Sequence, residues 1–287
     1  MENKTILITG STDGIGKVTA TELAKMGHTI IIHGRNKQKA ESVRDDIIQK
    51  SGNTKIDIMI ADLLSLSDIK RAATAFKNKY NKLDVLINNA GAFFQKNRET
   101  TSEGLEKTLA LNLFAPHLLT QLLLELLANS PSARIINLSS SMHKRSGRPD
   151  FDDFQFTKNY KPDRAYGLSK LYLIWISQYL ANQLKEKNMN ISVNVCHPGA
   201  VATNFGQDAD KGFFINMIFK VALLFMDKPI QGAQSSIYLA VSSEVEKTTG
   251  KFFGNRNNLE QESTKYFTAE NQQKVWDYAQ NIIAPYL

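Results

Sequence analysis

The fold is decided by the stretch Thr9-Gly10-Ser11-Thr12-Asp13-Gly14-Ile15-Gly16, which directly follows the apolar run KTILIT at residues 4–9. Glycines have no Cβ atom, so a backbone that contains them can approach a ligand closely. The first turn of the helix that follows adds free N–H groups and the positive end of a dipole. A strand, a glycine-rich turn and a helical pattern from Ile15 to Met26 together predict a pyrophosphate site. A purely structural tight turn is the alternative.

The rest of the chain repeats this alternation of strand and helix. Uniformly apolar strands are typical of parallel sheets, whose two faces are both buried. Six such runs are present: KTILIT, TIIIH, KIDIMIA, LDVLINN, ARIINLS and ISVNVC. Helical patterns between them cover residues 15–26, 37–50 after a cap at Asn36, 66–80, 102–127 and 164–187.

This pattern predicts an α/β fold in a single domain. We expect a doubly wound, Rossmann-type three-layer sandwich with a central, mostly parallel seven-stranded sheet. Residues 1–130 are expected to form mainly the dinucleotide-binding half, and residues 131–287 the catalytic and substrate half. Two excursions, residues 142–163 and 203–228, follow strand ends and are expected to help enclose a substrate.

Composition limits the possible partners. The 287 residues include 35 Lys and Arg against 28 Asp and Glu, a net charge of +7, but the basic residues are dispersed. We therefore expect no nucleic acid partner. We also expect no metal site. The single cysteine, Cys196, excludes an internal disulfide and favours a reducing compartment. We expect a cytoplasmic protein without a transmembrane segment, because Phe213–Met226 is too short to span a bilayer; attachment to a membrane surface stays open.

A second motif, AYGLSK, carries acid–base chemistry. Tyr166 and Lys170 are four residues apart in a helical pattern and so share one face. A free tyrosine has a pKa of about 10. A nearby ammonium group stabilises the phenolate, and we expect it to lower that pKa toward the working pH. The same spacing is also common on exposed helices with no catalytic role.

These motifs resemble those of the short-chain dehydrogenase/reductase family, in which Thr-Gly-x-x-x-Gly-Ile-Gly follows the first strand. The serines at 139–141, His143, FDDFQ at 151–155 and Ala165–Lys170 resemble its retinol dehydrogenase-like branch. The resemblance implies hydride transfer between a nicotinamide and a carbonyl carbon, with Tyr166 as the general acid or base. It further implies that Lys170 tunes Tyr166, that Ser140 holds the substrate oxygen, and that the main chain of Asn112 supports a proton relay.

The resemblance also implies a set of cofactor contacts at the strand ends. The implied residues are Gly10, Ser11, Thr12, Asp13, Gly14, Ile15, Gly16, Asp62, Leu63, Asn89, Ala90, Gly91, Tyr166, Lys170, Pro198, Gly199, Val201 and Thr203.

The choice of nucleotide rests on the end of the second strand. An acidic residue there would bind the 2′-OH of NAD, but the chain has Arg35 and Asn36. A guanidinium pairs with the 2′-phosphate of NADP. We therefore expect NADP(H) as cofactor, with NAD(H) as the second possibility.

The phenylalanines near the strand ends predict an apolar substrate pocket. Phe93, Phe94, Phe205, Phe213 and Phe214, together with Phe151 and Phe154, are placed to line an apolar pocket. A hydrophobic aldehyde or ketone, retinal-like or another lipophilic carbonyl, is the expected substrate, unless residues 213–226 only pack as a lid or interface. The resemblance implies a homodimer or homotetramer.

Two other functions remain. One is a non-catalytic NADP(H)-sensing binding protein on the same fold, which would be expected to lose Tyr166 or Lys170. The other is a sugar-nucleotide epimerase, which shares Tyr-x-x-x-Lys but usually has another glycine spacing and a larger C-terminal domain.

Overall fold

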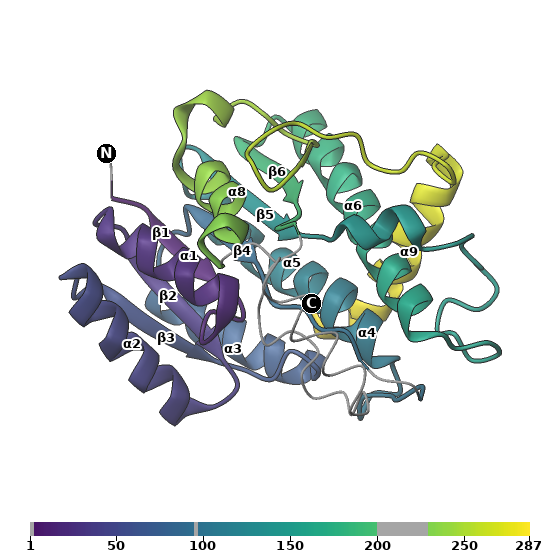
Figure 1. Cartoon of the computed structure of the whole chain (residues 1–287), viewed down its shortest axis with the longest axis horizontal. Helices are drawn as coiled ribbons and strands as arrows, with labels where there is room; N and C mark the ends of the chain where they lie inside the picture. The colour runs from purple at the N-terminus through teal and green to yellow at the C-terminus, as the bar shows by residue number, and fades with distance from the viewer. Residues whose placement is uncertain (1–2, 95–96, 200–228) are drawn as a thin grey trace, which may run out of the picture.

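The computed structural model describes residues 3–94, 97–199 and 229–287, and its centre is one parallel sheet (Figure 1). The strand order is β3-β2-β1-β4-β5-β6-β7, and every neighbouring pair is parallel. The strands are β1 (Thr5–Ile8), β2 (Thr29–Gly34), β3 (Ile56–Ile60), β4 (Val85–Asn88), β5 (Ala133–Leu138), β6 (Ile191–Cys196) and β7 (Phe252–Phe253). The predicted seven-stranded, doubly wound sheet is confirmed, and it is parallel throughout.

Helices cover both faces of the sheet (Figure 1). The described helices are α1 (Gly14–Lys25), α2 (Lys37–Ser51), α3 (Leu66–Lys79), α4 (Lys107–Leu109), α5 (Ala115–Ala128), α6 (Pro162–Glu186), α8 (Pro229–Val241) and α9 (Ala269–Ile283). A π-helical turn η1 (Ala110–Phe114) joins α4 to α5, and the 3₁₀ turns are η2 (Ser141–Arg145), η3 (Ser243–Val245) and η4 (Ala284–Tyr286).

The apolar strands supply two separate cores. Ile6 and Ile8 of β1 belong to the cluster under α1, α2 and α8, whereas Leu7 belongs to the cluster under α3, α5 and α6. Successive side chains of a strand point to opposite faces, so a strand buried on both sides must be apolar at every position. The sheet is therefore the middle layer of a three-layer sandwich.

The end of β2 shows how the local sequence sets these boundaries. Asn36 caps α2 as predicted, since its side-chain oxygen accepts from Lys39 N at 2.8 Å. The helix expected from residue 102 begins instead at Lys107, where the Glu106 carboxylate accepts from Thr108 N and Leu109 N. This boundary depends on a buried glutamate, which a search for apolar periodicity does not detect.

One of the described helical segments is long and apolar enough to cross a bilayer. It runs through α4, η1 and α5, Lys107–Ala128, with a mean hydropathy of 1.4 in its apolar window. Of this window, 72% is buried inside the protein. The segment therefore packs as a core helix beside the sheet.

Candidate active site

The glycine-rich turn packs against the end of β4. Gly10 has φ 62° and Gly14 has φ 50°, values that favour glycine. A Cβ on Gly16 would lie 2.5 Å from both Asn89 Nδ2 and Gly10 O. Asn89 Nδ2 in turn donates to Thr9 O at 2.8 Å. The turn is thus held in contact with the neighbouring strand end, and this contact requires the glycines.

Several backbone N–H groups of the turn have protein partners, among them Gly14 N, which donates to the Asp13 carboxylate at 2.8 Å. Gly10 N donates to His33 Nδ1 at 3.0 Å, and Ser11 N donates to His33 O at 3.0 Å. The next amides belong to the first turn of α1, which begins at Gly14 behind its Asp13 cap. Amides of a first helical turn have no intrahelical acceptor. The N-terminus of α1 is therefore the part of the turn best able to meet a phosphate.

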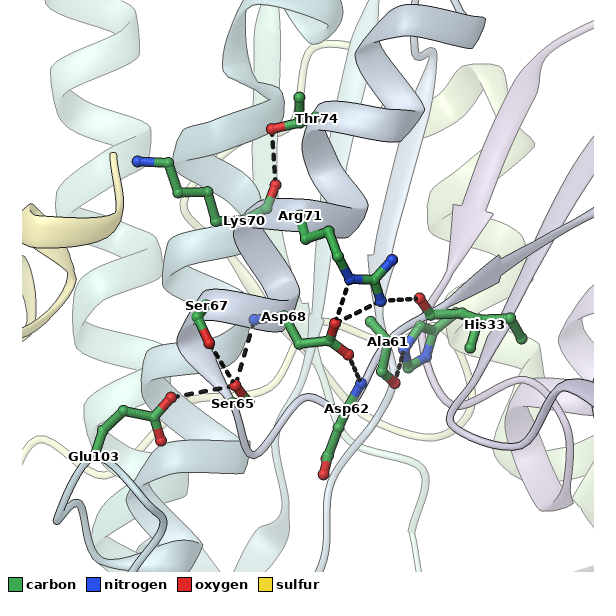
Figure 2. Close-up of polar contacts among 11 residues, drawn as sticks. His33, Ala61, Asp62, Ser65, Ser67, Asp68, Lys70, Arg71, Thr74 and Glu103 are labelled. Atoms are coloured by element: carbon green, nitrogen blue, oxygen red, sulfur yellow. Dashed lines mark hydrogen bonds and ion pairs between the residues drawn. The ribbon is translucent and has the colours of Figure 1, made fainter.

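The end of β3 is fixed by α3. Asp68 Oδ2 accepts from Asp62 N at 2.7 Å, and Arg71 donates to Asp68 Oδ1 and to the Ile60 carbonyl (Figure 2). The Asp62 side chain accepts from Leu64 N at 3.0 Å and is exposed, whereas Leu63 is buried. Asp62 thus has a fixed backbone and a carboxylate that faces solvent.

The end of β2 is positively charged. Arg35 is exposed there, next to Asn36, whose side-chain oxygen is used as a helix cap. Lys39 pairs with Asp13 of the glycine-rich turn at 2.9 Å, and Lys17 pairs with Asp46 at 2.8 Å. A carboxylate such as that of Asp13 repels a phosphate, but here the Lys39 ammonium group lies beside it.

Tyr166 and Lys170 lie on one face of α6, and both are buried. Lys170 Nζ donates to the Leu138 carbonyl at the end of β5, at 2.9 Å, and lies 5.8 Å from the centre of the Tyr166 ring. Ser139, which follows β5, donates to Lys170 O at 3.0 Å. The helix and the strand end are therefore joined at the two groups that the sequence proposes for catalysis.

Burial dominates the electrostatics of this pair. Burial raises the pKa of Tyr166 to about 12, and the hydrogen bond with Ser140 opposes the shift. Burial also lowers the pKa of Lys170 to about 7. The sequence predicted a lower tyrosine pKa because of the lysine charge. In the structure the pKa of Tyr166 is raised instead, because loss of water disfavours the charged phenolate. The same loss of water favours the neutral amine of Lys170, so its positive charge has less effect on Tyr166.

Asn112 lies on the π-helical turn and fixes the chain after β4. Its Oδ1 accepts from Ala92 N, and its Nδ2 donates to Ala92 O, both at 3.0 Å. Nδ2 also donates to Ser169 Oγ at 3.1 Å. A Cβ on Gly91 would lie 3.0 Å from Lys170 Nζ. Asn112, Gly91 and Lys170 therefore meet at the carboxyl end of the sheet, where ligands bind in folds of this type.

Ser140 is the N-cap of the 3₁₀ turn η2 and is held by His143. The Ser140 carbonyl lies 2.6 Å from His143 Nδ1 and also accepts from His143 N at 3.1 Å. His143 Nε2 accepts from Ser263 N at 3.1 Å, a residue more than a hundred positions later. Because Nε2 accepts, Nδ1 carries the proton and donates to Ser140. The loop with Ser140 is thus connected to the C-terminal segment.

The predicted aromatic pocket is only partly within the described residues. The Phe93 ring packs edge-on against Tyr166, with centroids 5.5 Å apart, and Phe94 is half-buried next to it in the chain. Phe154 instead stacks on Tyr278 of α9, with centroids 4.0 Å apart, and so packs in the core. Phe205, Phe213 and Phe214, like Val201 and Thr203, lie outside the described residues.

The remaining predicted cofactor residues lie at other strand ends. Ala90 N donates to Thr9 Oγ1 at 2.9 Å, and a Cβ on Gly34 would lie 2.6 Å from Thr12 Cγ2. Pro198 and Gly199 follow β6, where Gly199 has φ 77°. In the described part of the chain, no three His, Cys, Asp or Glu side chains gather as a metal site would require.

Sequence reasoning missed two residues of this region. His33, a single polar ring in an apolar strand, contacts the glycine-rich turn; its position at the strand end was the available signal. Glu260 lies 3.1 Å from His197 Nε2, and no local motif marks it.

Sequence comparison finds relatives of this chain over nearly its whole length. A profile of the short chain dehydrogenase family matches residues 4–212. Human retinol dehydrogenase 14 is 34% identical over 297 residues, which cover 99% of this chain and 87% of that protein. Human polyprenol dehydrogenase is 34% identical over 280 residues, which cover 96% of this chain and 83% of that protein.

Solved structures share the fold. A short chain dehydrogenase from Shigella flexneri 2a str. 301, complexed with NADP, has a TM-score of 0.71 at 25% identity, covering 89% of this chain and 98% of that chain. The Pseudomonas aeruginosa RhlG/NADP active-site complex has a TM-score of 0.70 at 25% identity, covering 88% and 95%. Since the sequence matches span nearly the whole chain and the solved structures share its fold, this chain belongs to the short-chain dehydrogenase family, with retinol dehydrogenases among its relatives.

Proposed function

We propose that this protein is an NADP(H)-dependent dehydrogenase that interconverts a hydrophobic aldehyde or ketone and the corresponding alcohol. The observation that carries the proposal is the junction of α6 with the end of β5. There Tyr166 is hydrogen-bonded to Ser140, and Lys170 Nζ lies beside Gly91 and Asn112. A phenol, a hydroxyl and an amine at the carboxyl end of a parallel sheet are the groups that carbonyl reduction requires.

The residues present fit a dinucleotide. The glycine-rich turn packs so closely that a Cβ on Gly16 would collide with Asn89 and Gly10, and it leads into the N-terminus of α1, where backbone amides can meet a phosphate. We assign the pyrophosphate to residues 12–16, the adenosine to Asp62, Leu63 and the 89–91 segment, and the nicotinamide end to Tyr166, Lys170, Pro198 and Gly199. When bound, the nicotinamide supplies or accepts the hydride.

The preference for NADP(H) is assigned to Arg35. Its guanidinium is exposed at the end of β2, next to the turn that would hold the phosphates. A planar cation can bind a 2′-phosphate with two parallel hydrogen bonds. Two solved structures of similar fold were determined with NADP, which supports the assignment.

The chain's own groups would move the proton. In reduction, the Tyr166 hydroxyl donates a proton to the carbonyl oxygen, and in oxidation the phenolate accepts one from the alcohol. Ser140 donates a hydrogen bond to the same oxygen and stabilises its developing charge. Burial raises the pKa of Tyr166 to about 12, so at neutral pH the phenol carries the proton that reduction requires. Lys170 stands nearby with its pKa lowered to about 7, and so can exchange a proton at neutral pH.

The proposed substrate class rests on the surroundings of Tyr166. The Phe93 ring packs against the Tyr166 ring and gives the reacting group an apolar neighbour. Two relatives are named retinol dehydrogenase and polyprenol dehydrogenase, after hydrophobic alcohols. We propose a lipophilic carbonyl in preference to a sugar.

The test combines a substrate series with one substitution. NADPH oxidation is measured with aldehydes and ketones of increasing chain length, using wild-type protein and Tyr166→Phe. We expect turnover to rise with chain length and to fall by at least about 100-fold in Tyr166→Phe, because the proton donor is lost. NADPH affinity, measured by fluorescence titration, should change less than about twofold.

Two results would reject the proposal. Turnover by Tyr166→Phe at the wild-type rate would exclude the assigned proton donor. Tight NADPH binding without reduction of any carbonyl would favour the non-catalytic binding protein instead.

A further inference from the structure

A buried histidine connects two parts of the nucleotide site. His33 lies near the end of β2 with its ring inside the protein. Its Nδ1 accepts from Gly10 N of the glycine-rich turn at 3.0 Å. Its Nε2 lies 3.2 Å from the Ala61 carbonyl, just after β3, and Figure 2 shows this second contact. One imidazole thus spans the gap between the turn and the β3 end.

These contacts define the state of the ring. A backbone N–H can only donate, so Nδ1 is the unprotonated nitrogen and Nε2–H is the donor to Ala61. Burial lowers the pKa of His33 to about 4, although Asp62 and Asp68 act in the opposite direction. At neutral pH the ring is therefore a neutral group with one donor and one acceptor, each matched to a backbone partner.

The main chain of His33 strengthens the connection. His33 O accepts from Ser11 N at 3.0 Å, and His33 N donates to Ser11 Oγ at 2.9 Å. Ser11 Oγ then donates to the Ile8 carbonyl at 2.7 Å. Main chain and side chain of one residue therefore bind Gly10 and Ser11, the two residues at the start of the turn.

We propose that His33 is a positioning residue for the dinucleotide: it fixes the glycine-rich turn relative to the β3 end, so that pyrophosphate and adenosine are held together. The inference rests on the proposed function for the nature of the ligand. It applies to NADPH and NADH alike, because both nucleotides have the pyrophosphate and the adenosine that are assigned to these segments.

The β3 end has a second support that does not reach the turn. Asp68 and Arg71 of α3 hold Asp62 N and the Ile60 carbonyl (Figure 2). With this support in place, loss of the His33 ring should leave the β3 end formed. The main-chain bonds between residue 33 and Ser11 remain, so mainly Gly10 of the turn is released. A binding defect without loss of the fold is therefore the expected sign of a positioning role.

The test uses three substitutions that remove the two ring contacts in different combinations. His33→Asn can keep the acceptor for Gly10 N, His33→Gln can keep the donor for Ala61, and His33→Leu keeps neither. The control is His117→Leu, which removes another buried histidine whose pKa is also lowered to about 4. The His117 ring contacts Gln280 and Trp276 of α9.

The dissociation constants of NADPH and NADH are measured by fluorescence titration, and the thermal midpoint is measured without nucleotide. We expect His33→Leu to weaken both nucleotides by about tenfold or more, because two buried backbone groups lose their partners. His33→Asn should recover most of this affinity, since it retains the contact with the turn. His117→Leu should lower the thermal midpoint while both dissociation constants stay within about twofold of wild type.

A folded His33→Leu protein with wild-type affinity overturns the inference. If that variant does not fold, wild-type affinity in His33→Gln, which loses the contact with Gly10, overturns it equally. Loss of affinity in His117→Leu to the same degree would also overturn it, because the effect would then be general destabilisation. A wild-type protein that binds neither nucleotide would instead reject the proposed function, and with it the premise of this inference.

Discussion

Lys170 combines a charge with complete burial, and this conflict has a measurable consequence. Burial lowers its pKa to about 7, whereas an unfolded lysine has a pKa of about 10.4. Between these pH values the unfolded chain binds the additional proton, so this residue makes stability rise with pH. Lys170→Met removes the effect. We expect the free energy of unfolding of wild type, relative to the variant, to increase by up to about 1.4 kcal/mol per pH unit from pH 7 to 9.

Urea unfolding of both proteins at pH 6.5, 8 and 9.5 measures this difference. A difference that stays constant with pH would show that the lysine titrates normally in the folded protein. The variant should also be inactive at every pH, because the groups proposed for catalysis are no longer complete.

Arg35 gives a second prediction at this scale. Arg35→Asp should weaken NADPH binding by about tenfold or more, because a carboxylate repels the 2′-phosphate, and should favour NADH through its ribose 2′-OH. Fluorescence titration with both nucleotides measures the change. Arg44→Asp on α2 is the matched control, with the same change of charge at a residue that pairs with Asp45. Equal effects of the two substitutions would indicate a general charge effect.

Single residues also show where sequence reasoning stops. The positions of Tyr166, Lys170 and the glycines at 10, 14 and 16 could be predicted, because each depends on local spacing. The direction of the Tyr166 pKa shift could not, because it depends on how much water the fold removes around the ring. His33 was missed because its partners Gly10 and Ala61 lie far from it in sequence.

At the scale of elements, strands and helices were predictable where their apolar pattern is regular. The α3 helix ends within one residue of its predicted boundary. The segment before α5 was not predicted correctly, because a π-helical turn carries Asn112 there and a buried Glu106 sets the start. Short π-helical turns occur frequently at functional sites, where they displace one residue from the regular helix.

The turn η2 allows a prediction about catalysis. His143 donates from Nδ1 to the Ser140 carbonyl and accepts at Nε2 from Ser263 N. We expect His143→Ala to lower kcat by about tenfold while the dissociation constant of NADPH is unchanged, because the turn loses its support but the cofactor contacts remain. His143→Asn, which can still donate to Ser140, should recover most of the activity. Steady-state kinetics and nucleotide titration of both variants test this, and a change confined to NADPH affinity would contradict it.

At the scale of the whole molecule, the site is built where elements distant in sequence meet. The turn after β1, the ends of β2 to β6 and the N-terminal half of α6 converge at the carboxyl edge of the sheet (Figure 1). The doubly wound fold predicts this location, because ligands bind at the carboxyl ends of its parallel strands. The fold class did not predict how residues 142–163 pack. That excursion was expected at the substrate, but its Phe154 lies between α6 and α9, stacked on Tyr278.

Because Phe154 packs in the core, we expect substitutions of it to change the stability of the protein without changing nucleotide binding. Its side chain is 8% exposed and packs against Tyr172 and Tyr278. Phe154→Ala should lower the free energy of unfolding by about 3–5 kcal/mol, because apolar burial is reduced and a cavity is left behind. The NADPH dissociation constant should stay at its wild-type value, because the Phe154 ring packs between α6 and α9 rather than at the strand ends. Phe154→Leu keeps most of the volume and should cost roughly 1 kcal/mol. Denaturant unfolding and nucleotide titration of both variants measure these effects, and weaker NADPH binding by the folded Ala variant would place Phe154 at the site after all.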